Sequence, residues 1–261
     1  MLEWIQRGLN QGRITTRYPR RPERPPAGYH GSVVVLDGEN APVGVERLCP
    51  TGAIALDAQQ RIKLDRGRCI LCGECVRGAP ERFAFASRYE TAERARSGLL
   101  VGDVHRPEGA LEATRKALGE QARMLRRSIH VRHIDCGSDG SEEWEIQALW
   151  NPYYDIQRLG FFLTNSPRHA DILLVTGGVT GPMRKPLERT WNVMPDPKAL
   201  VAVGTDACSG GLATEGELVA GGVDRVLPVD VYVPGSPPAP IAIMHALLLA
   251  TGQLAPGEVA A

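Results

Sequence analysis

Neither sign of charge prevails in this 261-residue sequence, which has 30 Lys and Arg residues against 30 Asp and Glu residues. A neutral chain lacks the overall field that attracts nucleic acid, so we expect no nucleic-acid partner. The sequence also lacks a long apolar run, since residues 239–250 are too few to span a bilayer and include His245. The N-terminal residues have neither the apolar core nor the cleavage site of a signal peptide. We therefore expect a soluble, cytoplasmic chain that can still be peripheral to a membrane.

Familiar catalytic motifs are missing as well. Gly177–Gly181 follows a strand-like run but fits neither G-x-x-x-x-G-K nor G-x-G-x-x-G. The histidines do not pair at metal-ligand spacing, and no Ser/His/Asp or Cys/His arrangement stands out. We therefore predict no catalytic residue.

Cysteines are few, six in all, but four of them form one ligand pattern. Cys69, Cys72 and Cys75 follow one another at x2 spacing, and Cys49 lies twenty residues upstream, before a proline. Four thiolates are what a [4Fe-4S] cluster requires, and we predict that these four bind one such cluster. A structural zinc ion is the alternative, but zinc favours paired C-x2–4-C knuckles. Thiolate ligands also indicate a reducing compartment rather than a disulfide framework.

Residues 30–90 contain two similar halves, as in bacterial ferredoxins. There, each C-x2-C-x2-C-x3-C-P run gives three ligands to one cluster and its last cysteine to the other. Here the first run keeps only Cys49, and the second run keeps its first three cysteines but ends at Ala79. One complete ligand set survives, so we predict that the second cluster is absent. Its missing ligands fall on Ala79, Glu39, Pro42 and Val45.

The segments on either side of this region have different patterns. Residues 1–16 read as a short amphipathic helix that docks on its own domain, on a partner or on a membrane surface. Residues 17–27 hold four prolines and four arginines, which predicts an extended arm that wraps a neighbouring surface, with a bare solvated linker as the alternative. Residues 109–128 have the apolar spacing of an amphipathic connector helix.

Residues 129–252 alternate between β-rich runs and helix candidates, which predicts a parallel sheet with flanking helices. The expected strands are Ile129–Ile134, Asp171–Thr176, Leu200–Val203 and Arg225–Val233, and the expected helices are Glu143–Leu149, Pro182–Val193 and Pro240–Leu249. Loops at the carboxyl ends of such strands are where sites form. These loops are Asp135–Glu142, Gly177–Gly181, Gly204–Gly211 and Val233–Pro238.

We therefore predict an α/β protein built from two folds. A bacterial-ferredoxin-like α+β domain precedes a flavodoxin-like α/β domain with a parallel sheet. The expected divisions are an N-terminal helix and arm (1–28), the [4Fe-4S] domain (29–100), the connector (101–128) and the α/β domain (129–255).

The first part of the chain resembles a known family. Residues 1–100 are similar to the ferredoxin-type subunits of energy-converting hydrogenases and formate hydrogenlyases, and to their relative in respiratory complex I. The resemblance rests on Gly12–Pro19 (GRITTRYP), the two cysteine runs and Arg88–Ala92 (RYETA).

The second part resembles another subunit of the same complexes. Residues 130–252 are similar to the small subunit of membrane-bound [NiFe] hydrogenases and the homologous cluster-bearing subunit of complex I. The chain thus looks like a fusion of two subunits. The residues that carry the second resemblance are His133–Ser138, Asn151–Gly160, Ser166–Asp171, Met194–Lys198 and Val229–Pro238.

The chain departs from that small subunit at all four ligands of its proximal [4Fe-4S] cluster. The resemblance places these ligands on Asp139, Glu142, Asp206 and Ser236, none of which is a cysteine. Four replacements remove the soft ligands that iron–sulfur clusters need, so we expect the fold and the partner surface to remain without the cluster.

Two further cysteines, Cys136 and Cys208, lie near these positions. Three readings stay open for them. They are buried small side chains, part of an altered metal site with Asp139, Glu142 and Asp206, or a redox disulfide.

The resemblance implies an iron–sulfur subunit of a membrane-associated complex, with one [4Fe-4S] cluster for electron transfer and an α/β domain docked on a large subunit. The alternative is a non-redox scaffold that couples the peripheral arm to antiporter-like membrane subunits and keeps its cluster for structure. In either role the chain is a non-catalytic subunit, peripheral on the cytoplasmic face of the inner membrane through its partners.

Overall fold

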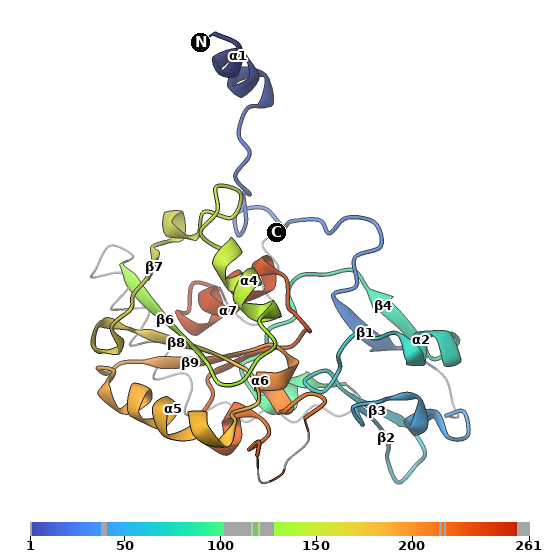
Figure 1. Cartoon of the computed structure of the whole chain (residues 1–261). Helices are drawn as coiled ribbons and strands as arrows, with labels where there is room; N and C mark the ends of the chain where they lie inside the picture. Colours follow the sequence, from blue (N-terminus) through green and yellow to red (C-terminus); the bar gives the residue numbers. More distant parts are fainter. Residues whose placement is uncertain are drawn as a thin grey trace.

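The computed structural model describes residues 2–37, 41–101, 116, 120, 128–213, 216 and 218–254. The predicted connector helix lies almost wholly outside these residues, and so does Glu39. Figure 1 shows two bodies side by side, a layered body around one sheet and a smaller body that contains β1 to β4. We call them the sheet unit (residues 128–254) and the N-terminal unit (residues 30–101).

The sheet unit contains a five-stranded parallel sheet in the order β10-β9-β8-β6-β7. This order is the 2-1-3-4-5 arrangement of flavodoxin-like folds. The predicted α/β class with a parallel sheet is therefore confirmed. The strands are β6 (Ile129–Asp135), β7 (Phe161–Leu163), β8 (Ile172–Thr176), β9 (Ala199–Val203) and β10 (Val231–Val233).

Successive residues of each strand point to opposite faces, so the apolar strands bury both faces. One face packs on α4 (Ser141–Ala148) and α7 (Pro240–Ala250), the other on α5 (Gly181–Val193) and α6 (Thr205–Ser209) (Figure 1). Every residue of α7 is buried, which explains its uniformly apolar sequence. The remaining turns of the sheet unit are η3 (Ile156–Leu159), η4 (Pro167–His169) and η5 (Val223–Arg225).

The N-terminal unit has its own hydrophobic core beneath two small antiparallel sheets. One pairs β1 (Ser32–Val35) with β4 (Phe83–Ala86), and the other has the order β2-β3-β5. The other elements are β2 (Ile54–Leu56), β3 (Ile62–Asp65), β5 (Leu100–Val101), η1 (Val45–Leu48), α2 (Glu74–Gly78) and η2 (Arg96–Leu99).

Residues 16–23, which precede the N-terminal unit, contact the sheet unit. The backbone N–H of Thr16 donates to the carbonyl of Tyr153 at 2.8 Å, and the Tyr153 hydroxyl donates to Glu23 at 2.7 Å. Tyr18 is 1% exposed and belongs to the core around α7. Its carbonyl accepts a hydrogen bond from Arg158. The arm is therefore anchored on its own chain.

Helix α1 (Leu2–Gln11) stands away from the rest of the chain in Figure 1. Its residues 3–11 are all exposed, with Trp4 at 68% and Leu9 at 78%. Docking on its own domain, one of the readings of residues 1–16, is therefore wrong, and the helix is shorter than predicted. No helix in the described part of the chain has the length and apolarity to cross a membrane.

A second connection joins the two units after β4. Glu93 forms an antiparallel bridge with Tyr232 at the edge of β10, with N–H to O distances of 2.9 and 2.7 Å. The Glu93 carboxylate accepts a hydrogen bond from Arg66 at 2.9 Å, and Arg96 binds the Asp65 carboxylate at 2.6 Å. Both arginine contacts tie the segment after β4 to the end of β3, beside the cysteine loop.

Candidate functional site

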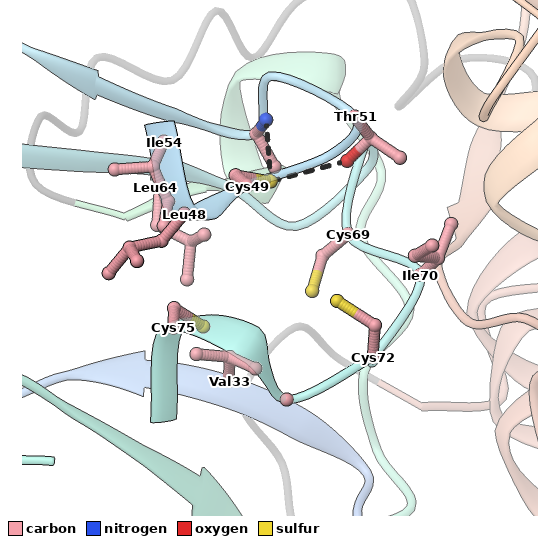
Figure 2. Close-up of a pocket in the computed structure, with 12 residues that line it drawn as sticks. Val33, Leu48, Cys49, Thr51, Ile54, Leu64, Cys69, Ile70, Cys72 and Cys75 are labelled. Atoms are coloured by element: carbon pink, nitrogen blue, oxygen red, sulfur yellow. Dashed lines mark hydrogen bonds between the residues drawn. The ribbon is translucent and has the colours of Figure 1, made fainter. Parts of the chain in front are cut away.

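The cysteines of the predicted ligand set come together in the N-terminal unit. All four line one hollow, with Val33, Leu48, Ile54 and Leu64 among its apolar neighbours (Figure 2). The four are Cys49 at the end of η1, Cys69 and Cys72 in the loop after β3, and Cys75 in α2. Residues far apart in sequence thus present thiols to a common space.

The cysteine loop has a backbone shaped for this purpose. Leu71 has φ +58° and Gly73 has φ +77°, so two residues flanking Cys72 are left-handed. Such conformations turn backbone N–H groups toward one centre, which favours anionic groups. Cys49 has similar support, because the Ala53 N–H donates to its Sγ at 3.2 Å.

Burial controls the acidity of these thiols. Burial raises the pKa of Cys69 to about 12, opposed by the Leu71 N–H and reinforced by the neighbouring thiols. Burial also raises the pKa of Cys75, and the charges of Cys49 and Cys72 add to the effect. Crowded thiols resist ionisation unless positive charge replaces their protons, which is what iron or zinc supplies.

The arrangement of the four thiols fits a [4Fe-4S] cluster better than a single metal ion. Within the described ranges, no three His, Cys, Asp or Glu side chains converge as a single metal ion would need. A cluster has a different requirement, because its thiolates bind different irons around a cubane. Four cysteines around an apolar hollow, with N–H donors aimed at sulfur, satisfy that requirement.

The positions where the ferredoxin pattern would place a second ligand set have a different character. Val45 is 1% exposed and Ala79 is 2% exposed, and both belong to the core of the N-terminal unit with Phe83. A Cβ added at Gly78 would lie 2.9 Å from the Leu48 side chain, so packing here is tight. Apolar side chains fill these described positions and offer no ligand atom.

Three carboxylates of the sheet unit follow the carboxyl ends of β6 and β9. Glu142, in the first turn of α4, is 3% exposed. Its Oε1 would lie 2.4 Å from a Cβ added at Gly204, so the side chain packs against the loop after β9. The charges of Asp206 and Asp139 raise its pKa, whereas Ser236 is exposed. Among the described residues these side chains do not converge closely enough to hold a metal ion, so the reading of an altered metal site has no support here.

Burial is the main cause of the raised pKa values of Glu142 and Asp206. It raises the pKa of Glu142 to about 7, and the charges of Asp206 and Asp139 add to the rise. Burial also raises the pKa of Asp206, while hydrogen bonds from Ser141 lower that of Asp139. These positions therefore offer hard oxygen atoms, and the carboxylate of Glu142 is poorly solvated.

We expect the variant Glu142→Gln to be more stable than the wild type above pH 7 and equally stable near pH 4.5. The folded protein holds the Glu142 proton more tightly than the unfolded chain does. The stability from this group is therefore complete below the unfolded pKa and is lost as pH rises through about 7. The difference should reach on the order of 3 kcal/mol at most. Denaturant unfolding from pH 5 to 8 measures it, and a pH-independent difference would contradict it.

Cys136 and Cys208 are both fully buried in the core around α5 and α6. Burial raises the pKa of each thiol to about 12. Both thiols are free, so the disulfide reading does not hold in this structure. Their surroundings fit the reading of small buried side chains.

Two contacts escaped the sequence reasoning. The Thr205 hydroxyl lies 3.0 Å from the carbonyl oxygen of Cys69, which joins the sheet unit to the cysteine loop. Glu143 accepts hydrogen bonds from Ser138 at 2.7 Å and from Thr176, and its carboxylate lies 3.4 Å from His133. Neither contact has a motif that could have signalled it.

Comparison with known proteins identifies a family for most of the sheet unit. The family model described as NADH ubiquinone oxidoreductase, 20 kDa subunit, matches residues 139–250. Formate hydrogenlyase subunit 7 of Escherichia coli is 45% identical over 130 residues, which are 50% of this chain and 51% of that one. The chain thus spans about half the length of that relative.

Two archaeal relatives are covered more fully. A probable membrane-bound hydrogenase subunit of Pyrococcus furiosus, mbhJ, is 41% identical over 140 residues, which are 54% of this chain and 84% of that one. An uncharacterized protein of Methanocaldococcus jannaschii is 44% identical over 135 residues, which are 52% of this chain and 88% of that one. Among solved structures, a chain of the membrane-bound sulfane sulfur reductase, an archaeal respiratory membrane complex, matches with TM-score 0.46 and 28% identity over 54% of this chain and 77% of that one.

Proposed function

Because the chain belongs to the family of the NADH ubiquinone oxidoreductase 20 kDa subunit, we propose that it is the iron–sulfur subunit of a membrane-associated complex. Two relatives are named as subunits of formate hydrogenlyase and of a membrane-bound hydrogenase. The proposed partners are a hydrogenase-like or complex I-like large subunit and antiporter-like membrane subunits. The chain would lie on the cytoplasmic face of the inner membrane through these partners.

The observation that carries the proposal is the common hollow of Cys49, Cys69, Cys72 and Cys75. We propose that these four thiolates hold one [4Fe-4S] cluster, which supplies one-electron transfer when bound. The apolar lining shields Cys75, which is the buried member of the set, and the Ala53 N–H stabilises negative charge on Cys49. Cys72 is the exposed cysteine of the four, so its edge is where a partner can approach.

The sheet unit would fill the small-subunit position without a cluster of its own. Asp139, Glu142 and Asp206 offer hard oxygen atoms where soft thiolates are needed. Electrons would therefore enter and leave through the N-terminal unit alone. The corresponding division of the chain into arm (1–28), ferredoxin-like domain (29–100), connector (101–128) and α/β domain (129–255) is part of this proposal.

A scaffold is the second candidate, and the connections between the two units favour it. The Glu93–Tyr232 bridge and the Thr205–Cys69 hydrogen bond join the cysteine loop to the sheet unit. In this reading the cluster is structural, and the chain couples the peripheral arm to the antiporter-like membrane subunits.

Metal analysis of the anaerobically purified chain tests the cluster directly. We expect about four irons per chain and an EPR signal of a [4Fe-4S] cluster after reduction. About eight irons would refute the loss of the second cluster, and about one zinc without iron would favour the zinc alternative. Turnover of the cluster signal in the intact complex with a reductant would favour the relay over the scaffold.

A further inference from the structure

Thr205 lies where the two units meet, at the first position of α6. Its side chain is fully buried. The hydroxyl oxygen is 3.0 Å from the carbonyl oxygen of Cys69 and 3.1 Å from that of Gly235. A residue of the sheet unit thus contacts the backbone of a proposed cluster ligand in the other unit.

The neighbouring donors and acceptors indicate which carbonyl group accepts the hydrogen of the Thr205 hydroxyl. A hydroxyl group has one hydrogen to donate. The Gly235 carbonyl already accepts the Thr205 backbone N–H at 2.8 Å, and the Gly235 N–H lies 3.4 Å from the hydroxyl oxygen. The Cys69 carbonyl is the nearer acceptor and lacks the backbone donor that Gly235 has, so we assign the hydroxyl hydrogen to Cys69, with the hydroxyl oxygen accepting from the Gly235 N–H. Successive donors in such a chain polarise one another, which strengthens the last bond.

The cysteine loop has matching support on its other side. The Thr51 hydroxyl donates to the Arg68 carbonyl at 2.6 Å, from within the N-terminal unit. Thr51 and Thr205 thus hold neighbouring carbonyl groups, those of Arg68 and Cys69, from two different units. Loss of the Thr205 hydroxyl would leave the half-buried Cys69 carbonyl without this donor.

The place of Thr205 in the sequence adds to the argument. It directly precedes Asp206, and Gly235 directly precedes Ser236, two of the positions where the resemblance places thiolates. The two loops of the sheet unit in which we expect no cluster ligand therefore surround the hydroxyl that binds the cysteine loop.

We propose that Thr205 is a positioning residue that raises the reduction potential of the cluster on Cys69, an inference that rests on the proposed function. Reduction adds one electron to the cluster and makes it more negative. Hydrogen bonds to the sulfurs and the charge around a cluster are among the factors that set its potential. The Thr205 hydroxyl bonds the carbonyl of Cys69 and not its sulfur, so it acts by offsetting the partial negative charge of that carbonyl and by holding the ligand residue in place. Without it, the cluster should be harder to reduce.

The test compares Thr205→Val, which keeps the shape without the hydroxyl, with Thr205→Ser, which keeps the hydroxyl. Thr251→Val is the matched control, because Thr251 is also fully buried and donates to a backbone carbonyl, that of Leu247, at 3.0 Å. The full chain is purified anaerobically, its iron is quantified, and the midpoint potential is measured by EPR during a dithionite titration. We expect a more negative midpoint for Thr205→Val alone.

Two results would overturn the role of Thr205 and leave the proposed function standing. They are a wild-type potential in Thr205→Val at full iron content, and an equal shift in Thr251→Val. If Thr205→Val loses iron, Thr205→Ala replaces it, and a wild-type potential there overturns the role as well. A wild-type chain without iron would defeat the proposed function together with this inference.

Discussion

The variant Cys72→Ala is expected to lose the iron of the cluster, from about four irons per chain to near none, together with the EPR signal of the reduced protein. A cluster held by three thiolates lacks a ligand at one iron. Cys72 is the exposed member of the set, so its replacement removes a ligand with little loss of packing. Because metal-binding free energy is also folding free energy, the N-terminal unit should lose stability as well.

Cys136→Ala is the matched control, because this cysteine lies in the core of the sheet unit outside the proposed ligand set. It should retain the iron content of the wild type. Full iron content in Cys72→Ala would remove Cys72 from the ligand set. In the intact complex, assembly without electron flow would identify a relay, and failed assembly in a complex without redox turnover would identify a scaffold.

The variant Gly177→Ala is expected to destabilise the sheet unit by about 3 to 4 kcal/mol. Gly177 has φ +77°, and an added Cβ would lie 2.5 Å from the backbone of Gly137 and from that of Ser138. These are backbone atoms of the loop after β6, so they cannot turn aside as a side chain can. The loop that carries Asp139 and Glu142 would have to move. Urea unfolding followed by tryptophan fluorescence measures the loss.

Gly140→Ala separates the backbone strain from the clash. Gly140 has φ +90° in the same group of loops, but no atom lies within 4 Å of an added Cβ. We expect this variant to lose about 1 to 2 kcal/mol, the cost of a left-handed residue with a side chain. Equal losses in the two variants would show that the close approach of the loops contributes nothing.

The sequence was most informative where one physical requirement acts locally. The strands β6, β8 and β9 were predicted within a residue or two, because strands buried on both faces are apolar throughout. Strand β7, Phe161–Leu163, was missed because three residues at a sheet edge give no measurable pattern. The extent of α1 was overestimated, because the polar residues after Gln11 do not distinguish a helix from an arm.

For the candidate site, spacing alone grouped Cys69, Cys72 and Cys75, because a tight loop fixes their geometry. The carboxylate cluster needed the family resemblance, since nothing in the local sequence brings Asp206 to Glu142. The Thr205–Cys69 contact joins residues 136 positions apart, and a single hydroxyl leaves no sequence pattern. A contact between the two units depends on the surfaces of both folded units, so the sequence of one segment does not predict it.

The placement of Tyr18 has a consequence for the order of events during synthesis. Tyr18 is made before the core that buries it, because that core is built mainly from residues 129–254. Ala92, which follows the cysteine loop in sequence, is buried in the same core. The N-terminal unit has a core of its own and can fold while translation continues, as domains generally do. Both ends of that unit can therefore be fixed only after α7 has been made and has packed on the sheet.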